Sequence, residues 1–321
     1  MSTQQRIGPG TVETVAGLSA GLASTIIVHP LDIIKTRMQL DTSPNPLLNS
    51  TRSVLRDILR NEGPTRIAAL YRGLTPNLLG NASGWALYFL WYKQGQDLVR
   101  SARGYGPDKA LTNLDYLAAS AGAGALSAVL TNPIWVVKTR MISTSSATEG
   151  AYPSMLSGFR SIWRSEGYRG YFHGLVPALF GVSHGALYFL AYENLKIWYR
   201  EKRQHQQLSN VDTAVASALS KVFAGTITYP SQVVRSRLQR YDPSAKIITP
   251  GPGLVRVTLG LWRNEGITGF YKGIVPNLAR VVPSTCVTFL VYENTRWALP
   301  RLFNDESARS TTALQCCCSC E

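Results

Sequence analysis

The chain has 321 residues, a net charge of +14 and a mean hydropathy of -0.02. No stretch reaches the roughly 20 uninterrupted apolar residues of a simple membrane span. The positive charge suits an anionic partner, whether nucleic acid, a membrane surface or small molecules. Basic residues are dispersed along the chain, and no RNA-binding module, catalytic motif, metal-ligand cluster or Gly-rich phosphate loop is present. These patterns argue against a nucleic-acid-binding protein, a metal site and an enzyme.

After a short predicted tail at 1–9, the sequence repeats itself in three units, at 10–103, 110–203 and 208–302. The tail has neither an apolar signal core nor an Arg-rich presequence, so any organelle address is expected to be internal. Each unit carries a proline with a base five residues later, then an aromatic-x-Gly step, then an aromatic closing segment. The matching residues are Pro30, Pro133 and Pro230, then Gly73, Gly174 and Gly273, then Tyr92, Tyr192 and Tyr292. Recurrence of three elements in the same order excludes chance.

Each unit predicts two long helices joined by a short amphipathic helix. The first long helix carries small residues in its early turns, such as Gly17 and Gly21, which let helices approach closely in a bilayer. The proline inside each such helix predicts a kink at the same position in all three units. The segments near 50–61, 154–165 and 254–264 are typical of amphipathic helices at a membrane surface.

Four of the five cysteines gather in the predicted tail at 303–321: Cys316, Cys317, Cys318 and Cys320. Their spacing fits neither a disulfide framework nor a zinc site. A disordered tail, palmitoylation and thiol chemistry all remain open for this segment.

Motif, order and period together resemble the mitochondrial carrier family, over roughly residues 10–302. The resemblance implies an all-α membrane protein of six transmembrane helices in a pseudo-threefold barrel, with short matrix-side surface helices. It implies a monomer in the mitochondrial inner membrane, in contact with cardiolipin, with both termini toward the intermembrane space. A peroxisomal or plastid relative of the same architecture remains open. The substrate is expected midway between two charged networks that open and close alternately.

The network expected on the matrix side departs from the family pattern. That pattern has an acid two residues after each proline and a base three residues further on. The acid positions hold Asp32, Trp135 and Gln232, and the basic positions hold Lys35, Lys138 and Arg235. The resemblance implies that Asp32 and Lys138 form the surviving ion pair and that this gate is comparatively weak.

The opposite network is also incomplete. The family pattern, aromatic-acid-x-x-base, is kept as Glu193 with Lys196 and as Glu293 with Arg296, whereas the first unit has Lys93 at the acid position. The resemblance implies Glu193 with Arg296 as the best candidate pair here.

Trp135 indicates the class of substrate. A tryptophan at this acid position resembles the branch of the family that carries folate, flavin nucleotide, NAD or pyrimidine nucleotides. The stretches 179–187 and 229–235 are similar to the mitochondrial folate/FAD carriers. The indole offers a flat face for a ring system, or it plugs a gate that has lost an ion pair, and the two roles are compatible.

The contact points that the resemblance implies for the substrate are Gly80, Gly181 and Arg280. Arg280 is expected to grip a phosphate or carboxylate, and the glycines either leave room for a bulky substrate or pack helices. The second unit is one residue shorter here, so its contact point can shift to Phe180 or Val182. Two further candidates complete the predicted set: Asn81, next to Gly80, and His184, which either binds substrate or is a buried structural histidine.

The sequence thus predicts a transporter that works by alternating access. Its expected substrate is a bulky anionic heterocyclic cofactor, FAD or folate, which is cargo and not a resident cofactor. NAD or a pyrimidine nucleotide is the alternative.

Overall fold

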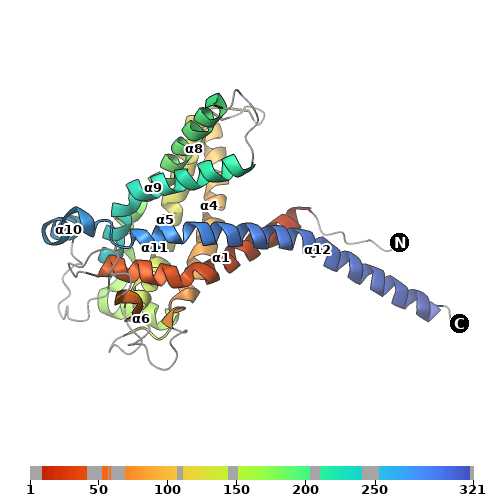
Figure 1. The fold of residues 1–321 in the computed structure, drawn as a ribbon, viewed down its shortest axis with the longest axis horizontal. Helices are drawn as coiled ribbons and strands as arrows, with labels where there is room; N and C mark the ends of the chain where they lie inside the picture. The colour runs from red at the N-terminus through yellow and green to blue at the C-terminus, as the bar shows by residue number, and fades with distance from the viewer. Residues whose placement is uncertain are drawn as a thin grey trace. The chain divides into compact units, whose positions relative to one another are not determined.

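The computed structural model describes residues 9–41, 53–56, 58, 69–106, 111–143, 151–202, 210–240 and 253–318. All regular elements among them are helices, which confirms the predicted all-α fold for the described part of the chain. In chain order they are α1 (Pro9–Leu40), α4 (Leu74–Ala102), α5 (Asn113–Ser143), α6 (Met155–Glu166), the 3-10 helix η1 (Gly167–Phe172), α7 (Leu175–Phe180), α8 (Ser183–Lys202), α9 (Asn210–Gln239), α10 (Leu254–Gly269), α11 (Ile274–Ala279) and α12 (Val281–Cys318) (Figure 1).

Among the described residues, four segments are long and apolar enough to cross a membrane. They are Val12–Leu40, Asn113–Ser143, Met155–Lys202 and Ile274–Leu299. The helices α4 and α9 have 29 and 30 residues, enough to span the hydrocarbon core at about 1.5 Å per residue. Charged side chains such as Lys93 and Lys221 lower their hydropathy. Hydropathy alone therefore recognises only part of the six predicted spans.

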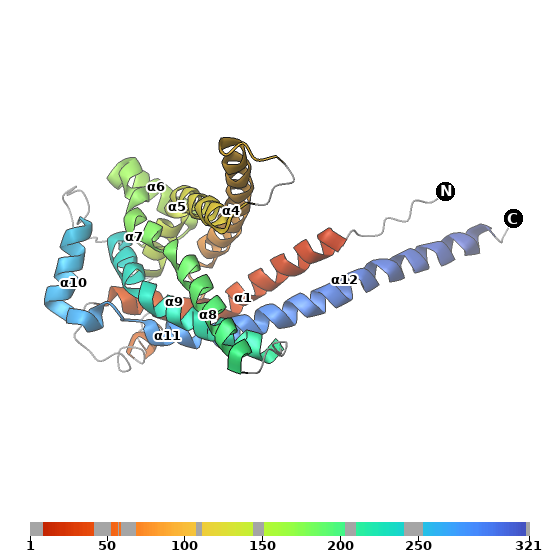
Figure 2. The ribbon, with the colours of Figure 1, turned by 90° about the horizontal axis from the view of Figure 1, so that it is seen from above.

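The chain forms two compact units, one made of residues 1–29 and 279–321 and the other of residues 30–278. In the first unit, the N-terminal part of α1 runs beside α12, as Figures 1 and 2 both show. The hydroxyls of Ser24 and Ser284 lie 2.9 Å apart across this helix pair. The backbone of α12 continues as a helix to Cys318, which differs from a disordered tail.

In the second unit, the C-terminal ends of α1, α5 and α9 are joined by a ring of three hydrogen bonds. Each comes from an arginine Nε, seven residues after the internal proline, to a backbone carbonyl of the next repeat. The pairs are Arg37 with Ile142 at 3.1 Å, Arg140 with Gln239 at 3.2 Å, and Arg237 with Gln39 at 2.9 Å. We call Arg37, Arg140 and Arg237 the arginine layer. The third repeat closes onto the first, so this end of the fold has the predicted threefold order.

The aromatic-x-Gly step turns the chain into the second helix of each repeat. Gly273 has a φ of 83°, which favours glycine. A Cβ atom there would lie 2.9 Å from both the carbonyl oxygen of Lys35 and the hydroxyl of Tyr229. The same hydroxyl donates a hydrogen bond to the carbonyl of Lys272. Tyr229, which stands directly before Pro230 in α9, thus connects this helix to the turn that precedes α11.

The short surface helices follow the prediction in the second and third repeats, as α6 and α10. Helix α6 begins with a capping box between Ser154 and Ser157. Its buried side chain Ile162 packs in a cluster with Val136 and Val137 of α5. In the first repeat, 53–56 and 58 are helical, and the rest of the predicted segment lies outside the described residues.

Candidate functional site

Three basic side chains from three repeats lie two residues before the arginine layer, and we call Lys35, Lys138 and Arg235 the cation layer. Lys35 Nζ donates a hydrogen bond to Gln232 Oε1 at 2.9 Å. Lys138 Nζ donates one to Asn77 Oδ1 at 2.8 Å. The acceptors of these two hydrogen bonds are neutral amide oxygens, and the weak gate stays a prediction. The pairing of Lys138 with Asp32 stays a prediction.

The indole of Trp135 lies close to two of the three cations of this layer, Lys138 and Arg235. Its ring centre is 4.8 Å from Lys138 Nζ and 5.8 Å from the guanidinium carbon of Arg235. Both distances are within the range of cation–π attraction. The indole therefore occupies the acid position with an aromatic surface that faces two cations.

The indole of Trp135 packs against Gly80. A Cβ atom at position 80 would lie 3.2 Å from Trp135 Cζ2. In this conformation the indole of Trp135 therefore occupies the space beside Gly80, and both interpretations of Trp135 stay predictions. A contact between substrate and Gly80 would need the indole to move.

Asn77 is a site residue that the sequence analysis missed. It is 1% exposed, and its Oδ1 accepts from Lys138 Nζ and also from Asn81 Nδ2, at 3.3 Å. The predicted residue Asn81 thus reaches the cation layer through Asn77. The signal available in the sequence was the repetition of Pro76-Asn77 as Pro276-Asn277.

The second helix of the second repeat is interrupted at the predicted contact point. Helix α7 ends at Phe180 and α8 begins at Ser183, so Gly181 and Val182 lie in the break. The third repeat is interrupted at the equivalent place, between α11 and α12, although it lacks no residue, so the missing residue of the second repeat does not by itself explain the break. A Cβ atom on Gly124 of α5 would lie 3.0 Å from Val182 Cγ1, so Val182 contributes to helix packing in this conformation.

His184 follows the break and is half-buried. Its Nδ1 lies 3.1 Å from Thr228 Oγ1 on α9, so the ring has a protein partner. Arg280 lies at the corresponding break between α11 and α12, in the unit made of residues 1–29 and 279–321. The roles of His184 and Arg280 toward substrate stay predictions.

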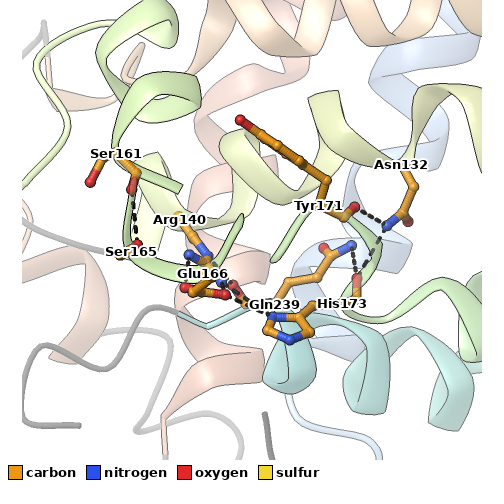
Figure 3. A network of polar contacts seen from close by, with 8 residues as sticks. All are labelled: Asn132, Arg140, Ser161, Ser165, Glu166, Tyr171, His173 and Gln239. Atoms are coloured by element: carbon orange, nitrogen blue, oxygen red, sulfur yellow. Dashed lines mark hydrogen bonds and ion pairs between the residues drawn. The ribbon is translucent and has the colours of Figure 1, made fainter. Parts of the chain in front are cut away.

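Two residues toward the C-terminus from the cation layer, the guanidinium groups of Arg140 and Arg237 are each held by a glutamate that stands before a glycine, Glu166 and Glu265. Arg140 Nη2 donates to Glu166 Oε2 at 2.9 Å, and His173 Nδ1 lies 3.2 Å from the same oxygen (Figure 3). The equivalent pair is Arg237 Nη2 with Glu265 Oε2 at 2.8 Å. The sequence analysis gave these glutamates no role.

Glu265 shows how strongly such a fork is held. Burial tends to raise the pKa of its carboxyl, but hydrogen bonds and charges from Arg237 and Lys272 outweigh burial and lower the pKa below its ordinary value. Lys272 Nζ lies 2.7 Å from Glu265 Oε2. The carboxylate therefore stays ionised and keeps both partners at neutral pH.

At the opposite network, the described residues form one local pair and one pair between α1 and α12. Glu193 Oε1 lies 3.4 Å from Lys196 Nζ within α8. In the other unit, Arg296 Nε lies 3.4 Å from Glu13 Oε1, with both side chains about half exposed, and Glu293 is exposed. Glu13 was not predicted, and the pairing of Glu193 with Arg296 stays a prediction. Exposed pairs of this kind contribute roughly 0–1 kcal/mol.

Comparisons with known proteins bear on this arrangement. Residues 9–103, 109–203 and 206–301 each match the family described as mitochondrial carrier protein. The mitochondrial FAD carrier protein FLX1 of Saccharomyces cerevisiae is 41% identical over 304 residues, which cover 89% of this chain and 96% of that protein. The chloroplastic folate transporter 1 of Arabidopsis thaliana is 39% identical over 291 residues, 87% of this chain and 92% of that protein. The mitochondrial nicotinamide adenine dinucleotide transporter 2 of the same plant is 37% identical over 288 residues, 87% and 77% of the two chains.

The family match recurs in each of the three repeats, which are also the units that the arginine layer joins into a ring. The relatives cover nearly the whole chain at an identity well above the level at which family membership is in question. The chain is a member of the mitochondrial carrier family, and it is a transporter and not an enzyme.

Proposed function

We propose that this protein carries FAD or a folate across the mitochondrial inner membrane by alternating access. The observation that carries the proposal is the environment of Trp135, whose indole faces the cationic groups of Lys138 and Arg235. An aromatic surface beside positive charge suits an anionic heterocycle, since the ring can stack while the charges attract. The similarity to an FAD carrier and a folate transporter points to the same class.

The substrate site combines Trp135 and its two neighbouring cations with the predicted contact points. Arg280 grips the anionic part of the substrate, while Gly80, Asn81, Gly181, Val182 and His184 line its path. Because Trp135 now fills the space beside Gly80, entry of substrate displaces the indole and opens that space. Transport then alternates between the network of Asp32, Lys35, Lys138, Gln232 and Arg235 and the network of Glu193, Lys196, Glu293 and Arg296.

The protein's oligomeric state, lipid contact and orientation in the membrane are proposed from the resemblance to the family. The carrier works as a monomer, with cardiolipin at the membrane surface and both termini toward the intermembrane space. The transporting body consists of the repeats at 10–103, 110–203 and 208–302. The tail at 303–321 lies outside it.

An NAD carrier is the second candidate, supported by the 37% identity to a nicotinamide adenine dinucleotide transporter. The two candidates are separated by uptake into proteoliposomes that contain the purified protein, with labelled FAD, a folate, NAD and UTP compared side by side. Saturable uptake of FAD or the folate is expected. Uptake of NAD or UTP alone would contradict the substrate assignment and leave the transport function in place.

A further inference from the structure

The cation layer carries more positive charge than its own network neutralises. The six positions of the network hold three bases, one acid (Asp32) and two uncharged residues, Trp135 and Gln232. Counted over these six positions, a surplus of two positive charges remains, in a segment of the helices where charge is costly. Two hydrogen bonds of the layer, from Lys35 to Gln232 and from Lys138 to Asn77, go to neutral amides.

Arg235 shows this surplus most clearly. Within the described part of the chain, its guanidinium has neither a hydrogen bond nor an ion pair, and its neighbour is the ring of Trp135 at 5.8 Å. A guanidinium has five N–H donors in a planar fork that matches phosphate oxygens. The fork is thus available to a ligand.

The layer is also accessible to water. Lys35, Lys138 and Arg235 are all partly exposed, although they stand within one or two helical turns of buried positions. Toward the C-terminal ends, Arg140 and Gln239 are each only 2% exposed. Solvent therefore reaches the three cations, while it is excluded from Arg140 and Gln239.

We propose that Lys35, Lys138 and Arg235 form an anion subsite around Trp135 that receives the diphosphate of FAD, and that FAD, which has this group where a folate has carboxylates, is the preferred of the two proposed substrates. The inference rests on the proposed function and deepens it. Bound substrate supplies the negative charge that the missing carboxylates at positions 135 and 232 do not. A diphosphate carries at least two negative charges next to each other, which fits two cations that flank one indole. Substrate then favours the closed form of this gate because it binds that form better.

The subsite is tested with inorganic pyrophosphate, which carries the proposed group and no ring. The full-length protein is purified in detergent, and its thermal unfolding is followed as pyrophosphate is added at constant ionic strength, with sulfate and glutarate as comparison anions. The expected result is a rise in Tm with pyrophosphate that exceeds both others. An equal rise with glutarate contradicts the assignment to a diphosphate, and no rise with any of the anions contradicts the subsite.

Two variants locate the binding. Arg235→Gln is expected to weaken pyrophosphate binding by about tenfold or more, since it removes a charge-assisted contact. Arg160→Gln removes a charge from an exposed position on α6 and is expected to respond like the unmodified protein. An unchanged response of Arg235→Gln contradicts the subsite.

Gln232→Glu keeps the test decisive if Arg235→Gln does not fold. The added carboxylate lies beside Lys35 and neutralises part of the surplus, so pyrophosphate binding is expected to weaken by about tenfold as well. Unchanged binding by Gln232→Glu contradicts the charge argument.

The failure of this inference is distinct from the failure of the proposed function. Saturable FAD uptake by a protein that ignores pyrophosphate overturns the subsite and leaves the function. A protein that binds pyrophosphate through Arg235 but transports neither FAD nor a folate retains the subsite and loses the proposed substrate.

Discussion

The arginine layer and the cation layer lie on the same three helices, two residues apart, and differ in their symmetry. Each arginine donates to a backbone carbonyl of the next repeat, and in one case the acceptor residue is Ile142, whose side chain has no hydrogen-bonding group. In the cation layer, the partners are two different amides and an indole. Backbone acceptors tolerate changes of side chain, so the arginine layer keeps the ring closed while the layer above it diverges. The asymmetric layer is therefore where the chemistry of one substrate is expected.

The largest expected effect comes from breaking the arginine layer. Arg140→Ala removes the bond to Gln239 and leaves the Glu166 carboxylate without its strongest partner. Loss of one partner from a buried ion pair costs about 3 kcal/mol or more, which corresponds to a fall in Tm of roughly 5 °C or more for a chain of this size. Thermal unfolding in detergent measures it, with the exposed Arg160→Ala as control. Equal Tm values for the two variants would show that the layer does not hold the fold together.

The second prediction asks whether the cation layer suffices for transport without Arg280. Arg280→Ala is expected to lower the rate of cofactor uptake by about 100-fold, since a charge-assisted fork is lost, while Tm changes little. Arg280→Lys should recover part of the rate. The exposed Arg263→Ala on α10 is the matched control. Normal uptake by Arg280→Ala would remove this residue from the site.

The third prediction makes the cation layer more symmetric. Gln232→Glu gives Lys35 a carboxylate in place of an amide, with an expected gain of about 1 kcal/mol and a rise in Tm of a few degrees. Uptake should slow, because the gate then has an ion pair to break. In the double variant with Lys35→Gln, the gain in Tm should disappear. If Gln232→Glu alone gives no gain, the weak-gate interpretation is wrong.

The smallest effect is expected at the contact between α4 and α5. Gly84→Ala adds a Cβ where nothing lies within 4 Å, so it should stabilise α4 by up to about 1 kcal/mol. Gly80→Ala adds one against the indole of Trp135, and the strain should cancel that gain. The difference in Tm between the two variants is the measurement. Equal stabilisation by the two variants would mean that the indole of Trp135 moves aside without destabilising the protein.

Recurrence explains what the sequence could predict. The repeats, the kinked helices, the two surface helices and the positions of the cations all follow from residues that return three times. Asn77 and Glu13 were missed as partners because each lies on a helix whose approach to another helix the pattern does not define. The register change in the second repeat was visible as a missing residue. The breaks at Gly181 and at Arg280 were not predicted, because a continuous helix satisfies the same spacing.

The arginine layer has a consequence for the order of the repeats along the chain. Its three bonds run from the first repeat to the second, from the second to the third, and from the third back to the first. Such a ring has no first member, so it is indifferent to where the polypeptide starts. A circularly permuted chain that opens between the second and third repeats would retain every bond of the ring. Loss of any whole repeat would remove two of the three bonds. The order of the repeats along the chain can therefore change more easily than their number can be reduced.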